Sequence, residues 1–457
     1  MERWQDAVEQ VVGADHVLTG ERISEDYARD EGLTTKPLMP RAVVRPATTA
    51  QVAAVLRACH EHEVSVTARG SGTGLSGACV ASEDGVILSF ERMKRVKEVD
   101  TDNHVAVVEP GVTLAELAEH TLPQGLVYPI MPGEDSASIG GNVATNAGGM
   151  RAVKYGVTRN NVLGLEAVLP TGDVIRTGGK FVKCSTGLDL TQLIIGSEGM
   201  LAVVTEVTLK LQPHFPHRAT LLLPFATLDE VTTAVPKLVG SGVGPLMLEY
   251  MDRLAMSSMT KSAGLELGIP QEIKDKAFAY LVVILEARSS ERLEQDVEFA
   301  GEQAAELGAL DVFSLPAQAG SDLLKAREQG FWVAKKGGAN DIVDVVVPRG
   351  AIPAYVAKVS EIASQHESLV VGAGHAGDGN IHFSVFQPDN VVRDRVMRAI
   401  FEAALGFGGA ISAEHGLGSE KRKYFLELED PNKIALMRRI KQAFDPKGVL
   451  NPGSAFD

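Results

Sequence analysis

The sequence predicts an α+β fold made of an N-terminal domain with a glycine-rich loop and a cap domain with an antiparallel sheet. Two features of the sequence lead to this prediction. A strand–helix–strand pattern over residues 41–67 runs directly into the glycine-rich stretch Arg69–Gly77. Beyond Pro213, strands and helices continue to alternate without glycine-rich loops between them, as in an antiparallel sheet with helices on one face. The 457 residues are enough for two or three domains.

Local patterns place the elements of the N-terminal domain. Residues 4–13 have the pattern of a short helix, and residues 20–36 that of an irregular polar lead-in. Thr48 or Thr49 can cap a helix over residues 51–62, because apolar residues recur there at helical spacing. A second helix is expected at residues 113–120. The expected strands cover residues 41–45, 64–67, 86–90, 95–100, 104–109, 162–169 and 174–177, followed by a strand pair over 199–211.

The cap domain and the C-terminal segment show the same kinds of pattern. Strands are expected at residues 221–225 and 280–286. Helices are expected at residues 227–240, 291–307 and 352–366. Residues 431–444 have the pattern of an amphipathic basic helix that stops before the pair Asp445-Pro446.

Composition and charge narrow the class of protein. The formal net charge of −15 argues against nucleic acid or an anionic membrane surface as the main partner. The three scattered cysteines Cys59, Cys79 and Cys184 form no CxxC pair, which excludes a disulfide framework and a cysteine metal cluster. The N-terminus does not resemble a signal peptide, and no apolar run reaches membrane-spanning length. The expected location is therefore cytoplasmic, while peripheral membrane attachment through a partner and a homodimer stay open.

The stretch Arg69–Gly77 has four glycines in nine residues, so its backbone can point successive N–H groups at one centre. Such a nest binds the diphosphate of a nucleotide cofactor, and Arg69 adds a positive charge. Residues 72–77 match G-x-G-x-x-G, but no amphipathic helix follows before the strand at 86–90. A Rossmann fold requires that helix, so the loop is expected to bind phosphate with its own backbone. A flexible surface turn is the alternative for this loop taken alone.

Two more glycine-rich segments, Pro132–Arg151 and Ile195–Thr205, are small and polar enough to lie against a planar cofactor. With these motifs the chain, from residue 37 onward, resembles flavoproteins of the vanillyl-alcohol oxidase and p-cresol methylhydroxylase type. Within that family it is similar to the branch of D-lactate dehydrogenase, the glycolate oxidase flavin subunit and D-2-hydroxyglutarate dehydrogenase. The resemblance implies a lead-in over residues 1–36, a two-lobed FAD-binding domain over 37–213, a substrate and cap domain with a metal site over 214–425, and a C-terminal segment over 426–457 that returns to the FAD domain.

The resemblance also implies which residues contact FAD. The diphosphate is expected at Arg69, Gly70, Ser71, Gly72, Thr73, Gly74 and Ser76. The isoalloxazine, ribityl and adenine groups are expected at Pro132, Gly133, Ser138, Gly140, Gly141, Thr145, Gly148, Glu198 and Gly199. Relatives that attach FAD covalently often use a histidine in or near the first glycine loop, and residues 69–80 contain none. Dissociable FAD is therefore expected.

Histidines and a carboxylate gather in two further segments. Residues 370–372 and 381–386 have the pattern of two strands around a tight turn at 377–380, which would place His375 and His382 close together. Glu414 and His415 follow in the segment Ile411–Gly418. Two histidines and one carboxylate suit a divalent metal with open positions, although each histidine taken singly can be a hydrogen-bonded structural residue.

The resemblance assigns His375, His382 and Glu414 to a divalent metal and His415 to the catalytic base. The ligand types leave open whether the metal is Zn²⁺, Mn²⁺ or Fe²⁺. A metal at the hydroxyl and carboxylate of a 2-hydroxy acid lowers the hydroxyl pKa, and a neutral imidazole can accept the proton. The expected reaction is oxidation of a D-2-hydroxy acid to the 2-oxo acid, with hydride transfer to N5 of the flavin. Electrons then leave to a separate acceptor, which is a protein, a quinone, a dye or oxygen.

Arg327 matches the position where relatives carry an arginine for the substrate carboxylate, and a guanidinium suits a carboxylate well. A solvated helix arginine is the alternative. Relatives that act on 2-hydroxyglutarate hold its distal carboxylate with a Thr and a Lys. In this chain, counting without gaps between Arg327 and the strand at 344–348 places Phe331 and Ile342 at those two positions. A monocarboxylate such as D-lactate, glycolate or a longer 2-hydroxy acid is therefore expected. Lys335 and Lys336 could replace the missing lysine if the loop is arranged differently, which keeps D-2-hydroxyglutarate open.

Two other functions compete with this interpretation. One is a catalytically silent, flavin-binding subunit of a glycolate oxidase-type complex, against which the complete set of His375, His382, Glu414 and His415 argues. The other is a metal-dependent hydrolase, against which three flavin-type loops and the lack of a nucleophile elbow argue.

Overall fold

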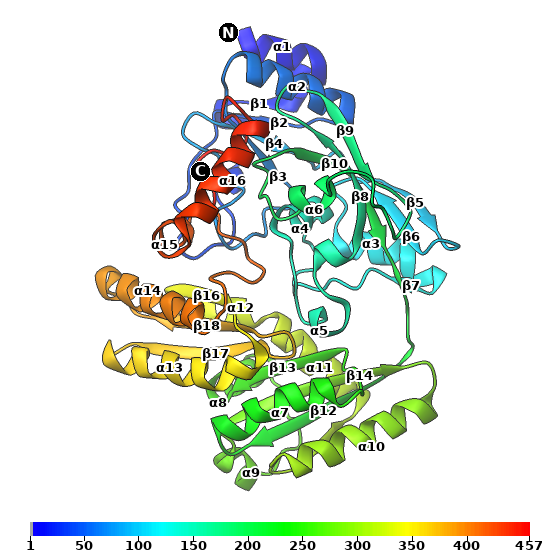
Figure 1. The fold of residues 1–457 in the computed structure, drawn as a ribbon, viewed down its shortest axis with the longest axis vertical. Coiled ribbons are helices and arrows are strands. Elements are labelled where there is room, and N and C mark those ends of the chain that lie inside the picture. The colour runs from blue at the N-terminus through cyan, green and yellow to red at the C-terminus, as the bar shows by residue number, and fades with distance from the viewer. Residues whose placement is uncertain (1–2) are drawn as a thin grey trace.

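The computed structural model describes residues 3–457, which form three large β-sheets and one short strand pair. In Figure 1 the elements from α1 to β11 lie mainly in the upper part, and those from β12 to α14 lie below them. The last helices return to the upper part. The predicted α+β fold with an antiparallel sheet in the cap domain is confirmed.

The first sheet belongs to the βαβ unit that precedes the glycine loop. Its strand order is β1-β2-β4-β3, with β2, β4 and β3 parallel. Thr48 caps α2 by accepting a hydrogen bond from the N–H of Gln51, as predicted. No helix forms over residues 70–85, all of which the structure describes, so the loop is not a Rossmann turn. The elements are α1 (Arg3–Val12), β1 (Val17–Leu18), β2 (Ala42–Val44), α2 (Thr49–Glu61), β3 (Val66–Arg69) and β4 (Val86–Ser89).

The second sheet is antiparallel, with strand order β5-β6-β10-β8-β9. The predicted strand pair over residues 199–211 is wrong, because one strand, β10, lies between β6 and β8, and only the short β11 follows it. The helix α4 lies inside the second glycine-rich segment and was not predicted. The elements are β5 (Val96–Asp100), β6 (Val105–Val108), α3 (Leu114–Thr121), β7 (Leu126–Val127), α4 (Ile139–Thr145), α5 (Ala152–Tyr155), β8 (Val162–Val168), β9 (Val174–Gly178), α6 (Leu190–Ile194), β10 (Val203–Lys210) and β11 (Gln212–Pro213).

The third sheet has seven antiparallel strands in the order β15-β12-β14-β13-β17-β18-β16. Its strands are β12 (His217–Phe225), β13 (Met247–Asp252), β14 (Ala279–Ala287), β15 (Phe313–Leu315), β16 (Asp341–Val346), β17 (Leu369–His375) and β18 (Asn380–Phe386). Its helices are α7 (Leu228–Gly240), α8 (Arg253–Ala263), α9 (Gln271–Lys276), α10 (Ser290–Glu306), α11 (Ala317–Glu328), α12 (Gly330–Lys336), α13 (Ile352–Gln365) and α14 (Asn390–Gly406).

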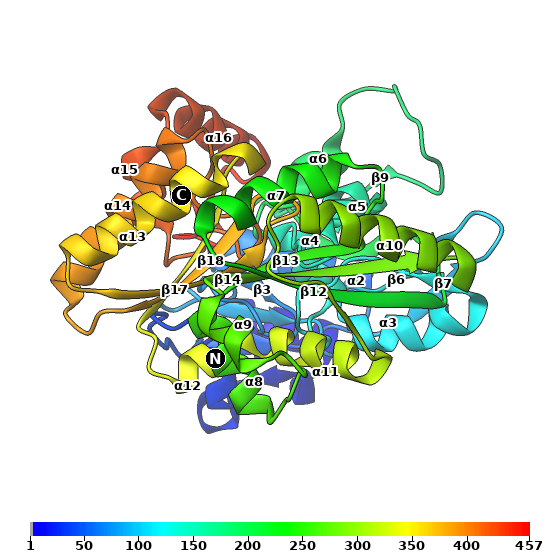
Figure 2. The ribbon, with the colours of Figure 1, turned by 90° about the horizontal axis from the view of Figure 1, so that it is seen from below.

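Helices pack on both faces of this sheet, so the expectation of helices on one face is wrong. Figure 2 shows α7, α10 and α13 on one side of the strands and α8, α11 and α12 on the other. The residues of Leu221–Phe225 are all buried, with Leu221 in one core and Leu222 in the other. An uninterrupted apolar strand is typical of a sheet covered on both faces.

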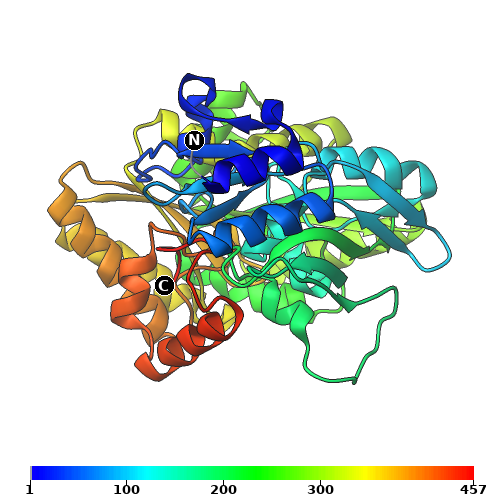
Figure 3. The same cartoon turned by 90° about the horizontal axis from the view of Figure 1, so that it is seen from above.

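The C-terminal segment packs against the first sheet. After α15 (Arg422–Leu428) and α16 (Pro431–Phe444), Leu450 forms a parallel bridge with Val66 of β3. The ammonium of Lys441 donates to the carbonyl oxygens of Met200 and Leu450. Figure 3 shows this segment, in red, beside the blue N-terminal elements. Among residues 3–457, none of the helices is both long and apolar enough to cross a membrane.

Candidate active site

A cavity of about 910 Å³ separates the glycine-rich segments from the seven-stranded sheet. One wall consists of backbone from the three glycine-rich segments, and the other of side chains from β16, β17, β18, α8 and α12. A cavity of this size is within the range that binds cofactors and small molecules. The histidines and carboxylates of the candidate metal site lie on the wall formed by the sheet.

Residues of the polar lead-in support the first glycine loop. The carboxylate of Asp30 accepts a 2.6 Å hydrogen bond from the N–H of Gly77. Arg69 donates to the carbonyl oxygen of Asp26 and to Sγ of Cys79. A Cβ atom at Gly72, where φ is +78°, would lie 2.1 Å from the guanidinium of Arg69, so this position requires glycine. The guanidinium therefore supports the loop, and a contact between Arg69 and phosphate stays a prediction.

Of the residues predicted to contact FAD, all but Gly148 line the cavity. A Cβ at Gly148 would lie 3.0 Å from Glu414, so this glycine makes room for the carboxylate. Gly133 and Gly199 have positive φ, and a Cβ at either would meet no atom closer than 3.9 Å. The side-chain nitrogen of Asn142, which also lines the cavity, is buried without a hydrogen-bond partner among residues 3–457. Open backbone and an unpaired donor fit a polar, planar cofactor such as FAD.

Glu198, whose contact with FAD stays a prediction, has a role within the chain as well. Its carboxylate accepts hydrogen bonds from the N–H groups of Leu417 and Gly418, at 2.7 and 2.9 Å, and from the hydroxyl of Ser454 at 2.9 Å. Ser76 donates its hydroxyl to the carbonyl oxygen of His415. Glu198 and Ser76 thus attach the segment that carries Glu414 and His415 to the glycine-rich loops.

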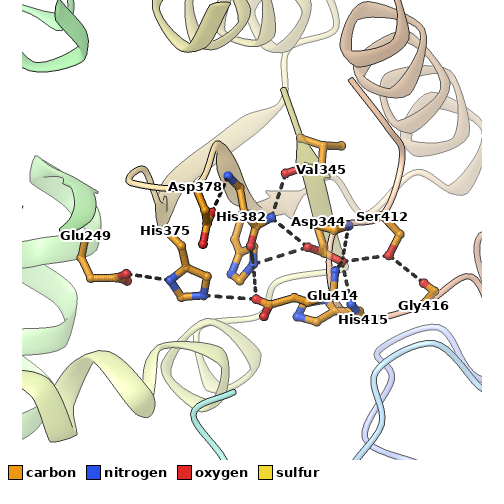
Figure 4. A network of polar contacts seen from close by, with 12 residues as sticks. Glu249, Asp344, Val345, His375, Asp378, His382, Ser412, Glu414, His415 and Gly416 are labelled. Carbon is orange, nitrogen blue, oxygen red and sulfur yellow. Dashed lines mark hydrogen bonds and ion pairs between the residues drawn. The ribbon is translucent and has the colours of Figure 1, made fainter. Parts of the chain in front are cut away.

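The predicted hairpin is formed by β17 and β18, and it brings His375 and His382 together (Figure 4). Their ring centres are 5.1 Å apart. Oε1 of Glu414 lies 3.1 Å from Nε2 of His375 and 3.0 Å from Nε2 of His382. Oε2 of Glu414 is buried and has no hydrogen-bond partner in the described part of the chain. Two nitrogens and a partly unpaired carboxylate at one point fit a divalent cation.

Glu249 on β13 orients this cluster and was not predicted. The Nδ1–H of His375 donates to Oε1 of Glu249 at 2.7 Å, which leaves Nε2 directed at Glu414. Such a carboxylate–histidine pair is the usual support for a metal-binding imidazole. Burial disfavours the charged imidazole, but Glu249 and Glu414 together raise the pKa of His375 well above its usual value.

Arg327 lies on the other side of Glu249. Its Nε is 3.0 Å from Oε2 of Glu249, within ion-pair distance. Its Nη2 is buried without a hydrogen-bond partner among the residues described, and the residue lines the cavity. The arginine is therefore fixed by one carboxylate and keeps donors for a second.

Asp344 on β16 is the second important residue that the sequence did not reveal. It is completely buried, and its Oδ2 accepts from the N–H groups of Glu414 and His415, at 3.1 and 2.8 Å. Oδ1 accepts from the side-chain amide of Asn380 at 2.9 Å. Burial by itself would raise the pKa of Asp344, but His415 and Lys421 hold it well below its usual value. The ionised carboxylate thus holds the loop of Glu414 and His415 in place.

Replacing Asp344 with alanine is expected to lower the free energy of unfolding by ~3 kcal/mol, because several buried donors and Lys421 lose their acceptor. Urea-induced unfolding, followed by far-UV circular dichroism, measures this change. Asp102, which is exposed, is the matched control, and its replacement with alanine is expected to change stability by less than ~0.5 kcal/mol. Equal stability of the two variants would contradict the role given to Asp344.

His415 lies beside His382, with ring centres 5.1 Å apart, and both line the cavity. Burial lowers the pKa of His415 to about 4, so its imidazole is neutral near pH 7. Ligand atoms of Asp344, His382, Glu414 and His415 all lie within 4.8 Å of one another. Because the oxygens of Asp344 are already occupied by donors, the set of His375, His382 and Glu414 has more capacity left for a cation.

Phe331 and Ile342 both line the cavity, whereas Lys335 forms a 2.9 Å ion pair with Glu31. Lys335 also lies over the ring of Trp332, 5.0 Å from its centre. Lys336 is exposed and is not among the residues that line the cavity. Neither lysine is therefore positioned as a free cation inside the cavity.

Comparison with known proteins gives matches along nearly the whole chain. Residues 40–178 match the family model described as "FAD binding domain", and residues 215–455 match "FAD linked oxidases, C-terminal domain". An uncharacterized FAD-linked oxidoreductase of Mycobacterium tuberculosis is 54% identical over 98% of this chain and 97% of its own length. A D-lactate dehydrogenase of Anaerostipes hadrus is 36% identical over 96% of this chain and 94% of its own length. The solved structure of p-cresol methylhydroxylase with substrate bound has the same fold, with a TM-score of 0.81 and 18% identity over 99% of this chain and 96% of that one.

Proposed function

The chain belongs to the FAD-linked oxidases and is an FAD-dependent oxidoreductase, and from this premise we propose that it oxidises a D-2-hydroxy monocarboxylic acid, such as D-lactate or glycolate, to the 2-oxo acid. The observation that carries the proposal is the position of His375, His382, Glu414 and His415 on the wall of the cavity that faces the glycine loops. A flavin held by those loops and a substrate held by the histidine cluster would share one cavity.

Each residue of the site has its own role in the proposed reaction. His375, His382 and Glu414 would hold a divalent cation, Zn²⁺ or Mn²⁺, which lowers the pKa of a hydroxyl group bound to it. Nη2 of Arg327 supplies an unpaired donor for the substrate carboxylate. His415 accepts the hydroxyl proton at its imidazole, which burial keeps neutral. FAD, when bound, supplies the acceptor for two electrons.

The cavity favours a monocarboxylate over 2-hydroxyglutarate. A distal carboxylate would meet Phe331 and Ile342, which offer it no donor and would leave it desolvated. Lys335 is engaged by Glu31. The sequence also predicts dissociable FAD, a separate electron acceptor and a cytoplasmic location, and it leaves a homodimer open.

Anaerobic titration with D- and L-2-hydroxy acids tests the proposal. The visible absorption of the flavin is expected to bleach with D-lactate or glycolate, but not with L-lactate or D-2-hydroxyglutarate. A flavin that stays oxidised with every acid would instead favour the silent, flavin-binding subunit of a larger complex. Bleaching by D-2-hydroxyglutarate at low concentration would contradict the preference for a monocarboxylate.

A further inference from the structure

An apolar slot extends from the histidine cluster along the seven-stranded sheet. Side chains two residues apart on a strand point to the same face. His382, Ser384 and Phe386 of β18 therefore share a face, and the pairing of the strands places Val371 and Ile342 on either side of Ser384. The next pair along the sheet is Leu369 and Phe386. All five residues beyond His382 line the cavity.

The dimensions of the slot follow from strand geometry. At ~3.4 Å per residue, the row of Val371, Ser384 and Ile342 lies ~7 Å beyond His382, and the row of Leu369 and Phe386 lies ~14 Å beyond it. Leu369 is 50% exposed, so the far end opens to solvent. The slot is therefore long and open at one end.

Two helices cover the slot on the side away from the sheet. Trp332 and Val333 of α12 and Met259 of α8 line the same cavity. At the far end, a Cβ on Gly337 would lie 3.9 Å from the ring of Phe386, so the end of α12 closes over that ring. Lys261 of α8 also lines the cavity, but it is exposed and lies at the rim. Ser258 and Ser262 of α8 line the cavity as well. The wall formed by the sheet beyond His382 is therefore apolar except for the hydroxyl of Ser384, whereas the wall formed by α8 is mixed.

We propose that this slot receives the side chain of the substrate, and that the preferred substrate is a 2-hydroxy acid with an extended apolar side chain of at least about five carbons. The inference rests on the proposed function, because it places the carboxylate at Arg327 and the hydroxyl at the histidine cluster. A methyl side chain would leave the slot unfilled, whereas a longer chain removes its apolar walls from water.

The slot predicts that kcat/KM depends on the length of the substrate's side chain. Burying one methylene is worth ~0.8 kcal/mol, which corresponds to a rise of about fourfold in kcat/KM for each added carbon. The increase is expected to continue until the chain passes Leu369 and Phe386, where solvent begins. Steady-state reduction of an artificial dye by FAD-loaded protein, with D-2-hydroxy acids of three to about ten carbons, measures it.

Two variants block the slot from neighbouring strands, Val371→Phe and Ser384→Leu. Each is expected to remove most of the rise with chain length, so that the ratio of kcat/KM between eight-carbon and three-carbon acids falls at least tenfold. Val391→Phe on α14, at a side chain that is 62% exposed, is the matched control and is expected to keep the wild-type ratio. Far-UV circular dichroism and flavin content establish that each variant is folded and loaded.

The outcomes separate this inference from the proposed function. If short acids reduce the flavin but kcat/KM is flat or falls with chain length, the slot does not bind the side chain, although the proposed function stands. If no 2-hydroxy acid of any length reduces the flavin, the proposed function itself fails. If Val371→Phe and Ser384→Leu fold but lose FAD, the slot holds part of the cofactor, and the inference is overturned.

Discussion

Replacing His415 with asparagine is expected to lower the rate of flavin reduction by a factor of ~10³ while leaving FAD content unchanged. A positioned general base contributes about 10² to 10⁴ in rate, and His415 is the neutral imidazole in the cluster. Asparagine keeps a polar side chain in the cavity but accepts no proton near pH 7. Stopped-flow absorption under anaerobic conditions, with saturating substrate, measures the rate directly.

The matched control is His62→Asn, because His62 is exposed at the end of α2. It is expected to react like the unmodified protein. A His415→Asn variant that reduces its flavin at more than about a tenth of the normal rate would show that another group takes the proton. His382 would then be the next residue to test, since its ring is adjacent.

Replacing Glu414 with glutamine is expected to weaken metal binding by at least ~100-fold. Loss of a group that only supports a metal ligand costs 10- to 100-fold in affinity, so loss of a proposed ligand should cost no less. Glutamine keeps the shape of the side chain but removes the charge that faces both His375 and His382. The ratio of metal to protein after gel filtration, measured by elemental analysis, reports the effect without relying on activity.

Glu402→Gln on α14 serves as the control, because that side chain is exposed. It is expected to retain the metal content of the unmodified protein. Equal metal content in the Glu414→Gln variant would remove Glu414 from the ligand set and favour a site built on Asp344 and His415 instead. Protein that never retains metal, even after incubation with Zn²⁺ or Mn²⁺, would contradict the metal site as a whole.

Most elements of the fold could be predicted because their signals are local. The cap at Thr48, the tight turn between β17 and β18 and the proline at the end of β11 each depend on a few neighbouring residues. Residues 321–328 of α11 have a helix-like pattern, but their place on the second face of the large sheet was missed. The helix α8 was missed altogether, because only Ala255, Met256 and Met259 form its buried face. A continuous apolar strand such as Leu221–Phe225 was the available signal for that second layer.

Apart from Arg327, the candidate site was predicted only where its residues stand in glycine-rich motifs. Asp344 and Glu249 lie in strands with no motif of their own, and each reaches its partners across large distances in sequence. The available signal was a carboxylate among apolar strand residues, as in Asp344-Val-Val-Val, because a buried charge requires partners. At Glu198 and Gly148 the motif suggested contact with FAD, but it gave no sign that the Glu198 carboxylate and the missing side chain of Gly148 also serve the segment of Glu414 and His415.

The contacts of Glu198 have a consequence for how the protein is made. Its three donors, Leu417, Gly418 and Ser454, lie 219, 220 and 256 positions further along the chain. A nascent chain tends to fold from its N-terminus as it leaves the ribosome, so the first sheets can form early. The donors to Glu198 are complete only when synthesis has passed Ser454, which lies beyond the bridge between Leu450 and β3. Until then the growing chain can fold its FAD-binding sheets, but Glu198, which is hydrogen-bonded to the loop of His415, lacks one of its three donors.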